Sequence, residues 1–162
     1  PVLLPKEHPL AAVNGVLNAV FVRGYPIEEA MFFGPGAGKP TASAVVSDII
    51  EIARGLGRNS AGRFGCTCYH KLPICPVEET VSSYYIRLLV EDKPGVLGKI
   101  ATTFGNVDVS LKSVVQTEAN LDNHVEIVVI THAVKHKNIL EAQAALRALS
   151  VVDDIFNVIR VD

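Results

Sequence analysis

The chain has 162 residues, of which 49% are hydrophobic and 20% are charged, and its formal net charge is −2 at pH 7. These values are typical of one average globular domain or two small ones, and they exclude a full dinucleotide-dependent enzyme with separate cofactor and substrate domains. The near balance of charges provides no electrostatic basis for binding nucleic acid or an anionic membrane surface, so neither partner is expected. No apolar run reaches the roughly 18 residues that would indicate a membrane-spanning helix.

The chain opens with Pro1-Val2-Leu3-Leu4-Pro5, which lacks the basic start and the long apolar run of a secretory signal. Because no methionine stands first, we expect a processed product or a fragment of a longer chain. After an extended segment at Val2–Leu4 come two segments rich in Val, Phe and Met, Leu17–Arg23 and Glu29–Gly34, joined by Gly24-Tyr25-Pro26. This pattern predicts a β-hairpin.

A glycine-rich loop, Gly34-Pro35-Gly36-Ala37-Gly38, leads from the hairpin into a predicted helix. Pro40 suits the first turn of that helix, and Gly55 is expected to end it. The apolar residues of the helix recur at helical spacing: Ala42, Val45, Val46, Ile49, Ile50 and Ala53. The loop departs from both the Walker and the Rossmann glycine patterns. Two interpretations remain open: a loop that binds an anion at the helix start, or a tight turn that needs glycine.

A hairpin, a loop and one helix leave one another's apolar faces incompletely covered, so residues 1–56 are expected to be the end of a domain. Residues 57–80 lack a sustained apolar period and are predicted to be a linker. The linker run Cys66-Thr67-Cys68-Tyr69-His70, together with Cys75, offers soft metal ligands, but C-x-C is an unusual spacing for a structural zinc site. An odd number of cysteines favours a reducing cytosol over a disulfide framework. We therefore expect reduced thiols, no metal site and a cytoplasmic location.

Residues 81–162 show strand and helix patterns in the order β-α-β-β-α-β. The predicted elements are a strand at Tyr84–Val90, a helix opened by Asp92-Lys93-Pro94-Gly95, a strand over Val107–Gln116, a turn at Glu118–Asn123, a strand at His124–His132, a helix with its apolar stripe at Ile139, Ala142, Leu146 and Leu149, and a strand at Asp154–Val161. This order predicts a ferredoxin-like fold, with two helices on one face of an antiparallel sheet. The chain as a whole is predicted to be α+β.

Three features of the first block occur together: the run His8-Pro9-Leu10-Ala11, the hairpin, and the glycine loop followed by Pro40-Thr41-Ala42-Ser43-Ala44-Val45-Val46-Ser47-Asp48. This combination resembles the end of the catalytic region of homoserine dehydrogenase. The resemblance implies that the loop approaches a nicotinamide cofactor, NAD or NADP, with Gly36, Ala37 and Gly38 as cofactor-binding residues. It also implies that the catalytic residues lie upstream of Pro1. This chain alone is therefore expected to be inactive and to hold no cofactor firmly.

The second block carries the runs Val90-Glu91-Asp92-Lys93-Pro94-Gly95-Val96-Leu97-Gly98-Lys99-Ile100 and Phe104-Gly105-Asn106-Val107-Asp108-Val109-Ser110-Leu111. These runs resemble an ACT domain, a small sensor of amino acids. The N–H groups of Gly95, Val96 and Leu97 at the helix start can receive a carboxylate, and Asp92 can pair with an ammonium group. The simpler interpretation is that Asp92 and Pro94 only start the helix.

The resemblance further implies that ACT sheets associate side by side or face to face. The remaining ligand-binding residues would then come from a partner chain: Asn106, Asp108, Ser110 and Leu111. Asp108 departs from the family pattern, because a glycine commonly turns the chain into the second strand there.

Together the two resemblances predict the carboxyl-terminal part of an NAD(P)-dependent homoserine dehydrogenase. Residues 1–56 would be the end of its substrate and dimerisation domain, residues 57–80 a linker, and residues 81–162 an ACT regulatory domain. The implied reaction interconverts L-homoserine and L-aspartate 4-semialdehyde in threonine, methionine and isoleucine biosynthesis, with L-threonine as the expected feedback ligand. A homo-oligomer formed through the ACT sheet and the hairpin is expected. The alternative is a noncatalytic, amino-acid-binding ACT subunit for regulation or dimerisation, in which the first block would have no role.

Overall fold

The computed structural model describes residues 1–56, 69–121 and 123–162. The chain forms two compact units, one made of Pro1–Leu4 with Ile74–Asp162 and the other of Pro5–Pro73. Residues 57–68 of the predicted linker, with Cys66 and Cys68, lie outside the described residues. The sequence groups Val2–Leu4 with the first block, whereas the structure joins them to the unit that contains the second block.

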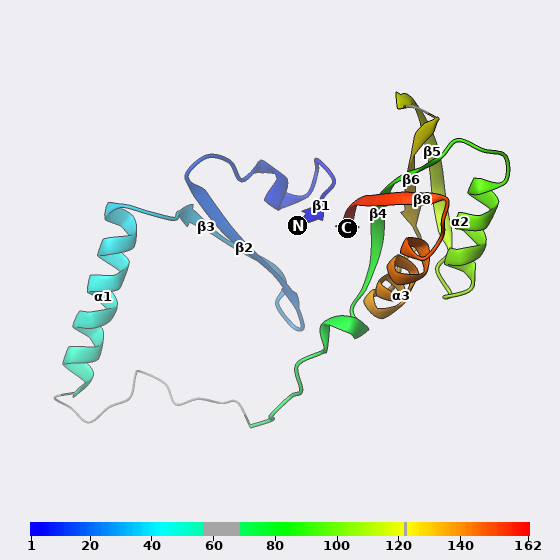
Figure 1. Cartoon of the computed structure of the whole chain (residues 1–162). Coiled ribbons are helices and arrows are strands. Elements are labelled where there is room, and N and C mark those ends of the chain that lie inside the picture. The colour runs from blue at the N-terminus through cyan, green and yellow to red at the C-terminus, as the bar shows by residue number, and fades with distance from the viewer. Residues whose placement is uncertain (57–68, 122) are drawn as a thin grey trace. The chain divides into compact units, whose positions relative to one another are not determined.

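The larger unit contains a sheet with strand order β1-β8-β4-β6-β5, in which β1 and β8 are parallel and the other neighbours are antiparallel. A short strand, β7, also pairs with the start of β4. The elements are β1 (Val2–Leu3), η2 (Val77–Glu79), β4 (Val81–Glu91), α2 (Val96–Gly105), β5 (Leu111–Leu121), β6 (His124–Thr131), β7 (Val134–Lys135), α3 (His136–Arg147) and β8 (Val152–Val161). The predicted ferredoxin-like order is confirmed, and Figure 1 shows β1 beside β8.

One hydrophobic core holds this unit together, because alternate residues of the central strands point toward the helices. On β4 the buried residues are Tyr84, Ile86, Leu88 and Val90. They pack with apolar residues of the other elements: Val125, Ile127 and Val129 of β6, Val96, Ile100 and Phe104 of α2, and Ile139, Ala142 and Leu146 of α3. Both helices therefore cover the same face of the sheet, as predicted.

Strand β8 contains two register shifts against β4, which leave Asp153 and Phe156 without a direct partner on that strand. Each of these residues is held by a side-chain contact instead. The Arg87 guanidinium lies 5.1 Å from the centre of the Phe156 ring, and His124 Nε2 lies 3.1 Å from Asp153 Oδ2. Such bulges locally increase the twist of a strand without ending its pairing.

The strand predicted from Val107 begins only at Leu111, so this part of the prediction is wrong. The N–H groups of Val107 and Val109 both donate to the carbonyl of Phe104, which winds the chain into a turn after α2. Asp108 has a φ of 57° in this turn, in the left-handed region. The alternating apolar pattern was therefore produced by a turn that buries Val109.

Three other predicted boundaries also differ from the structure. Strand β4 begins at Val81 rather than Tyr84, and β8 begins at Val152 rather than Asp154. Strand β5 continues to Leu121, into the segment predicted as a turn. Strand ends are poorly defined by sequence alone, because pairing with a neighbour extends them past the apolar pattern.

The smaller unit consists of η1 (Pro9–Ala12), β2 (Leu17–Gly24), β3 (Glu28–Pro35) and α1 (Lys39–Leu56). The predicted hairpin and helix are confirmed, but Gly55 lies inside α1 and does not end it. Its φ is not positive, so this glycine keeps a helical conformation. No residue of α1 is buried, and its apolar side chains remain exposed, as in Val45, Val46 and Ile49. Within the described ranges, no helix is both long and apolar enough to span a membrane.

Candidate functional sites

The predicted cofactor loop links β3 to α1. Gly36 follows the last residue of β3, and its N–H donates to the carbonyl of Val16 at 3.1 Å, so the loop runs beside the start of β2. Gly38 has a φ of +81°, a conformation that L side chains rarely adopt. Its carbonyl accepts the first helical hydrogen bond of α1, from Ala42 at 3.1 Å. The glycine at 38 is therefore required by the backbone whether or not a ligand binds.

The loop also presents unused hydrogen-bond donors at the positive end of α1. In the part of the chain that the structure describes, no backbone hydrogen bond uses the N–H groups of Ala37, Gly38 or Lys39. A Cβ added to Gly38 would meet no atom within 4 Å, so the backbone is open on that side. Free N–H groups and open backbone at a helix N-terminus suit a phosphate or carboxamide group of a dinucleotide.

The predicted amino-acid loop connects β4 to α2. It is tied at two points to neighbouring turns: the Glu91 N–H donates to the Val151 carbonyl at 3.1 Å, and the Asp92 N–H donates to the Asn123 carbonyl at 2.9 Å. The side chain of Asp92 is exposed. The neighbouring Lys93 forms an ion pair with Glu91, with Nζ 3.1 Å from Oε2. The carboxylate of Asp92 is thus exposed to solvent, where it can pair with an ammonium group.

Gly95 caps the N-terminus of α2 with a φ of 88°, and a Cβ at this residue would meet nothing within 4 Å. The N–H of Val96 donates to the Lys93 carbonyl at 3.3 Å, so it is partly used within the loop. Among the residues that are described, no backbone acceptor is bonded to the N–H groups of Gly95, Leu97 or Gly98. The open N–H groups therefore belong to Gly95, Leu97 and Gly98, whereas the sequence predicted those of Gly95, Val96 and Leu97.

The other predicted ligand residues lie at the opposite end of α2. Asn106 caps the helix C-terminus, Asp108 lies in the following turn, Ser110 directly precedes β5, and Leu111 begins β5. Ten residues of helix, about 15 Å at 1.5 Å per residue, separate them from Gly95. One chain therefore does not bring the two predicted groups together.

Two carbonyl groups that hold the amino-acid loop were not predicted from the sequence. They belong to Asn123, which has a φ of 69° in the β5–β6 turn, and to Val151, which precedes β8. An asparagine at a strand-to-strand turn is a usable signal, because Asn tolerates the left-handed region. No comparable signal marks Val151, whose contribution comes from the backbone alone.

His8 and Cys75 make structural contacts. His8, to which the sequence assigned no role, accepts a hydrogen bond at Nδ1 from the Leu10 N–H at 3.1 Å and packs edge-on against Phe21. The Cys75 thiol donates to the Pro76 carbonyl at 3.5 Å. Outside the undescribed segments, no group of three or more His, Cys, Asp or Glu residues could hold a metal ion.

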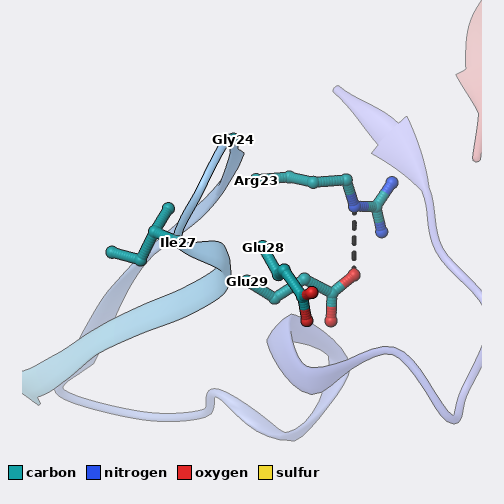
Figure 2. Close-up of a pocket in the computed structure, with 5 residues that line it drawn as sticks. All are labelled: Arg23, Gly24, Ile27, Glu28 and Glu29. Atoms are coloured by element: carbon teal, nitrogen blue, oxygen red, sulfur yellow. Dashed lines mark hydrogen bonds and ion pairs between the residues drawn. The ribbon is translucent and has the colours of Figure 1, made fainter.

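An open recess at the tip of the hairpin is lined by Arg23, Gly24, Ile27, Glu28 and Glu29. Figure 2 shows Arg23 and Glu29 pointing toward one another, with Arg23 Nε 3.0 Å from Glu29 Oε1. Both side chains are more than half exposed, so this ion pair contributes little. The recess contains none of the residues predicted for the cofactor loop or the amino-acid loop.

Known proteins match both units. The model of the homoserine dehydrogenase family matches residues 1–50, and that of the ACT domain matches residues 84–151. The homoserine dehydrogenase of Synechocystis is 43% identical over 99% of this chain and 38% of that protein, and the one of Neisseria gonorrhoeae is 39% identical over 100% and 39%. A crystal structure of the Thiobacillus denitrificans homoserine dehydrogenase has a TM-score of 0.82 and 33% identity, covering 100% of this chain and 38% of the other.

The ferredoxin-like unit with its β4–α2 loop thus matches the ACT domain, and the same chain carries a block that matches the homoserine dehydrogenase family. Over its whole length the chain is similar to homoserine dehydrogenases, by the family model at residues 1–50, by curated relatives and by a solved structure. It spans 38% of the length of the Synechocystis relative. The resemblance recognised from the sequence is therefore confirmed.

Proposed function

We propose that this chain forms the carboxyl-terminal part of an NAD(P)-dependent homoserine dehydrogenase, which interconverts L-homoserine and L-aspartate 4-semialdehyde. The observation that carries the proposal is the presence on one chain of the family block at residues 1–50 and the ACT domain at residues 84–151. A noncatalytic sensor subunit is not favoured, because it leaves the first block without a role.

In this proposal the first unit contributes the Gly36–Gly38 loop to the cofactor site. NAD(P) would supply the hydride acceptor when bound. The residues of this chain would bind and orient it: the N–H groups of Ala37, Gly38 and Lys39 would donate to the cofactor, and the start of α1 would favour its negative charge. The groups that act on homoserine would lie in the remainder of the enzyme, so the chain by itself is expected to transfer no hydride.

The ACT domain would bind a free amino acid, with L-threonine as the first candidate, and would regulate the enzyme by feedback. The open N–H groups of Gly95 and Leu97 would hold the carboxylate and Asp92 the ammonium group. A second chain would complete the pocket with Asn106, Asp108, Ser110 and Leu111, because these lie at the far end of α2 in their own chain. A ligand shared between two chains couples occupancy to the geometry of the oligomer.

Two measurements test the proposal. The full-length enzyme should reduce NAD(P) with L-homoserine, whereas the present chain should not, as followed by the absorbance of the reduced nicotinamide. Calorimetric titration of the present chain with L-threonine should release or absorb saturable heat. Binding of a different amino acid would replace threonine as the ligand, and an absence of binding by any amino acid would contradict the sensor role.

A further inference from the structure

Asn18 lies against the cofactor loop. It is the second residue of β2 and pairs directly with Gly34 of β3, while the preceding pair joins Leu17 to Pro35. The Gly36 N–H then continues the ladder by donating to the Val16 carbonyl. The loop therefore leaves the hairpin at the point where the Asn18 side chain projects from β2.

The Asn18 carboxamide fills the space beside Gly36. A Cβ built on Gly36 would overlap Asn18 Nδ2 and lie 2.6 Å from Asn18 Cγ, so no residue with a side chain fits there unless Asn18 moves. A Cβ on either of the flanking glycines, Gly34 or Gly38, would meet nothing within 4 Å. Gly36 also has no positive φ, unlike Gly38. Any side chain at position 36 therefore displaces the exposed Asn18 carboxamide, whereas the backbone conformation itself does not require glycine.

No hydrogen bond of the Asn18 carboxamide is found in the ranges covered by the structure. Its link to the loop is therefore steric, a direct contact between a planar amide and the backbone of a glycine. Such a contact has a defined distance and sets how closely the loop can approach β2. The three open N–H groups of the loop begin at the next residue, Ala37.

We propose that Asn18 is a positioning residue for the cofactor: it supports the backbone at Gly36 and so fixes where the N–H groups of Ala37, Gly38 and Lys39 point. This inference rests on the proposed function of the loop. Donors that are displaced by about 1 Å bind and orient a reactant much less well. A smaller residue at position 18 would leave the loop unsupported, and a side chain at position 36 would displace the Asn18 carboxamide from its place beside the loop.

The test uses the full-length enzyme with three single substitutions and one double substitution. Asn18→Ala should raise the KM for NAD(P) about 3- to 10-fold and leave the KM for homoserine unchanged, because only the cofactor donors are displaced. Gly36→Ala should raise the KM for NAD(P) more than about tenfold. The double variant Asn18→Ala/Gly36→Ala should recover part of this loss, since the added methyl then has room. Gly34→Ala, which adds the same methyl to open space, is the matched control and should resemble the unmodified enzyme.

Fluorescence titration with NADPH and the melting temperature accompany the kinetics. A role in folding alone would lower the melting temperature without changing cofactor affinity, and would overturn the inference. So would an unchanged NADPH affinity in Asn18→Ala, or a double variant no better than Gly36→Ala. An enzyme that binds NADPH, shows the expected affinities and yet does not oxidise homoserine would overturn the proposed function alone. An unmodified enzyme that binds no NADPH would overturn both.

Discussion

Arg87 of β4 and Glu126 of β6 form a paired contact across the sheet, with Nε 2.9 Å from Oε2 and Nη2 2.6 Å from Oε1. Both residues alternate with buried ones along their strands, so the pair lies on the face that the helices leave uncovered. The parallel hydrogen bonds match the planar guanidinium to the carboxylate. This contact lowers the pKa of Glu126 and raises that of Arg87, chiefly through the hydrogen bonds themselves.

The lowered pKa of Glu126 predicts a pH-dependent contribution to stability. A carboxylate whose pKa is lowered by folding stabilises the protein above its unfolded pKa, about 4.3, and this contribution is lost as the pH falls through the folded pKa. The substitution Glu126→Gln should therefore destabilise the chain at neutral pH and much less in acid. Urea unfolding at a series of pH values measures the difference. If the difference in unfolding free energy between the unmodified chain and Glu126→Gln stayed constant down to acid pH, this result would contradict the Arg87–Glu126 pairing.

A second prediction concerns the buried hydroxyl of Tyr84, which lies 2.9 Å from His136 Nδ1 and links β4 to the start of α3. Burial raises the pKa of this tyrosine, so its hydroxyl stays protonated. Tyr84→Phe should lower the free energy of unfolding by about 0.5–1.5 kcal/mol, the net value of one hydrogen bond. The neighbouring Tyr85→Phe is the matched control, because Tyr85 lies on the other face, half-buried. Equal losses in the two variants would show that the Tyr84–His136 contact contributes nothing specific.

A third prediction separates the two roles of Gly95. Both Gly95→Ala and Gly95→Asp place a side chain at a φ of 88°, so each should cost about 1–2 kcal/mol of stability. Only Gly95→Asp adds a carboxylate where the ligand's own is expected, and it should weaken L-threonine binding at least about tenfold more than Gly95→Ala. Calorimetry on the two purified variants makes the comparison. Similar affinities would place the ligand elsewhere.

The fourth prediction concerns β1. The Asp162 N–H donates to the Leu3 carbonyl at 3.1 Å, and Val2 and Leu3 pair with Arg160 and Val161. Deletion of residues 1–4 should abolish protection of the Asp162 amide against hydrogen exchange, while deletion of Pro1 alone should preserve it. The amides of β4 should stay protected in both, because β4 lies between β8 and β6. A protected Asp162 in the longer deletion would show that β1 is not its partner.

Local periodicity was sufficient to predict the ferredoxin-like unit. Its strands alternate because one face packs on helices, and α2 and α3 each carry one apolar stripe, so every element shows its own pattern. The prediction was wrong at a turn whose sequence has the alternation of a strand. Val107 and Val109 alternate with polar neighbours, but their N–H groups both donate to the Phe104 carbonyl. The warning was Asp108, which occupies a left-handed position that the related family often fills with glycine.

The candidate sites were predicted less completely, because contacts between distant segments leave no local pattern. The glycines of both loops were recognised from the family motifs. However, the role of Gly36 depends on Asn18, on another strand, and the amino-acid loop is held by carbonyls of Asn123 and Val151. Backbone carbonyls are the same for every residue type, so a sequence does not single them out.

The pairing of β1 with β8 has a consequence for how this unit is assembled during translation. Val2 and Leu3 are synthesised before the rest of the sheet, and their partners Arg160 and Val161 after all of it. A contact of such long range forms late and slowly. Without β1, the edge of β8 would present unpaired backbone groups that strands of other molecules could bind.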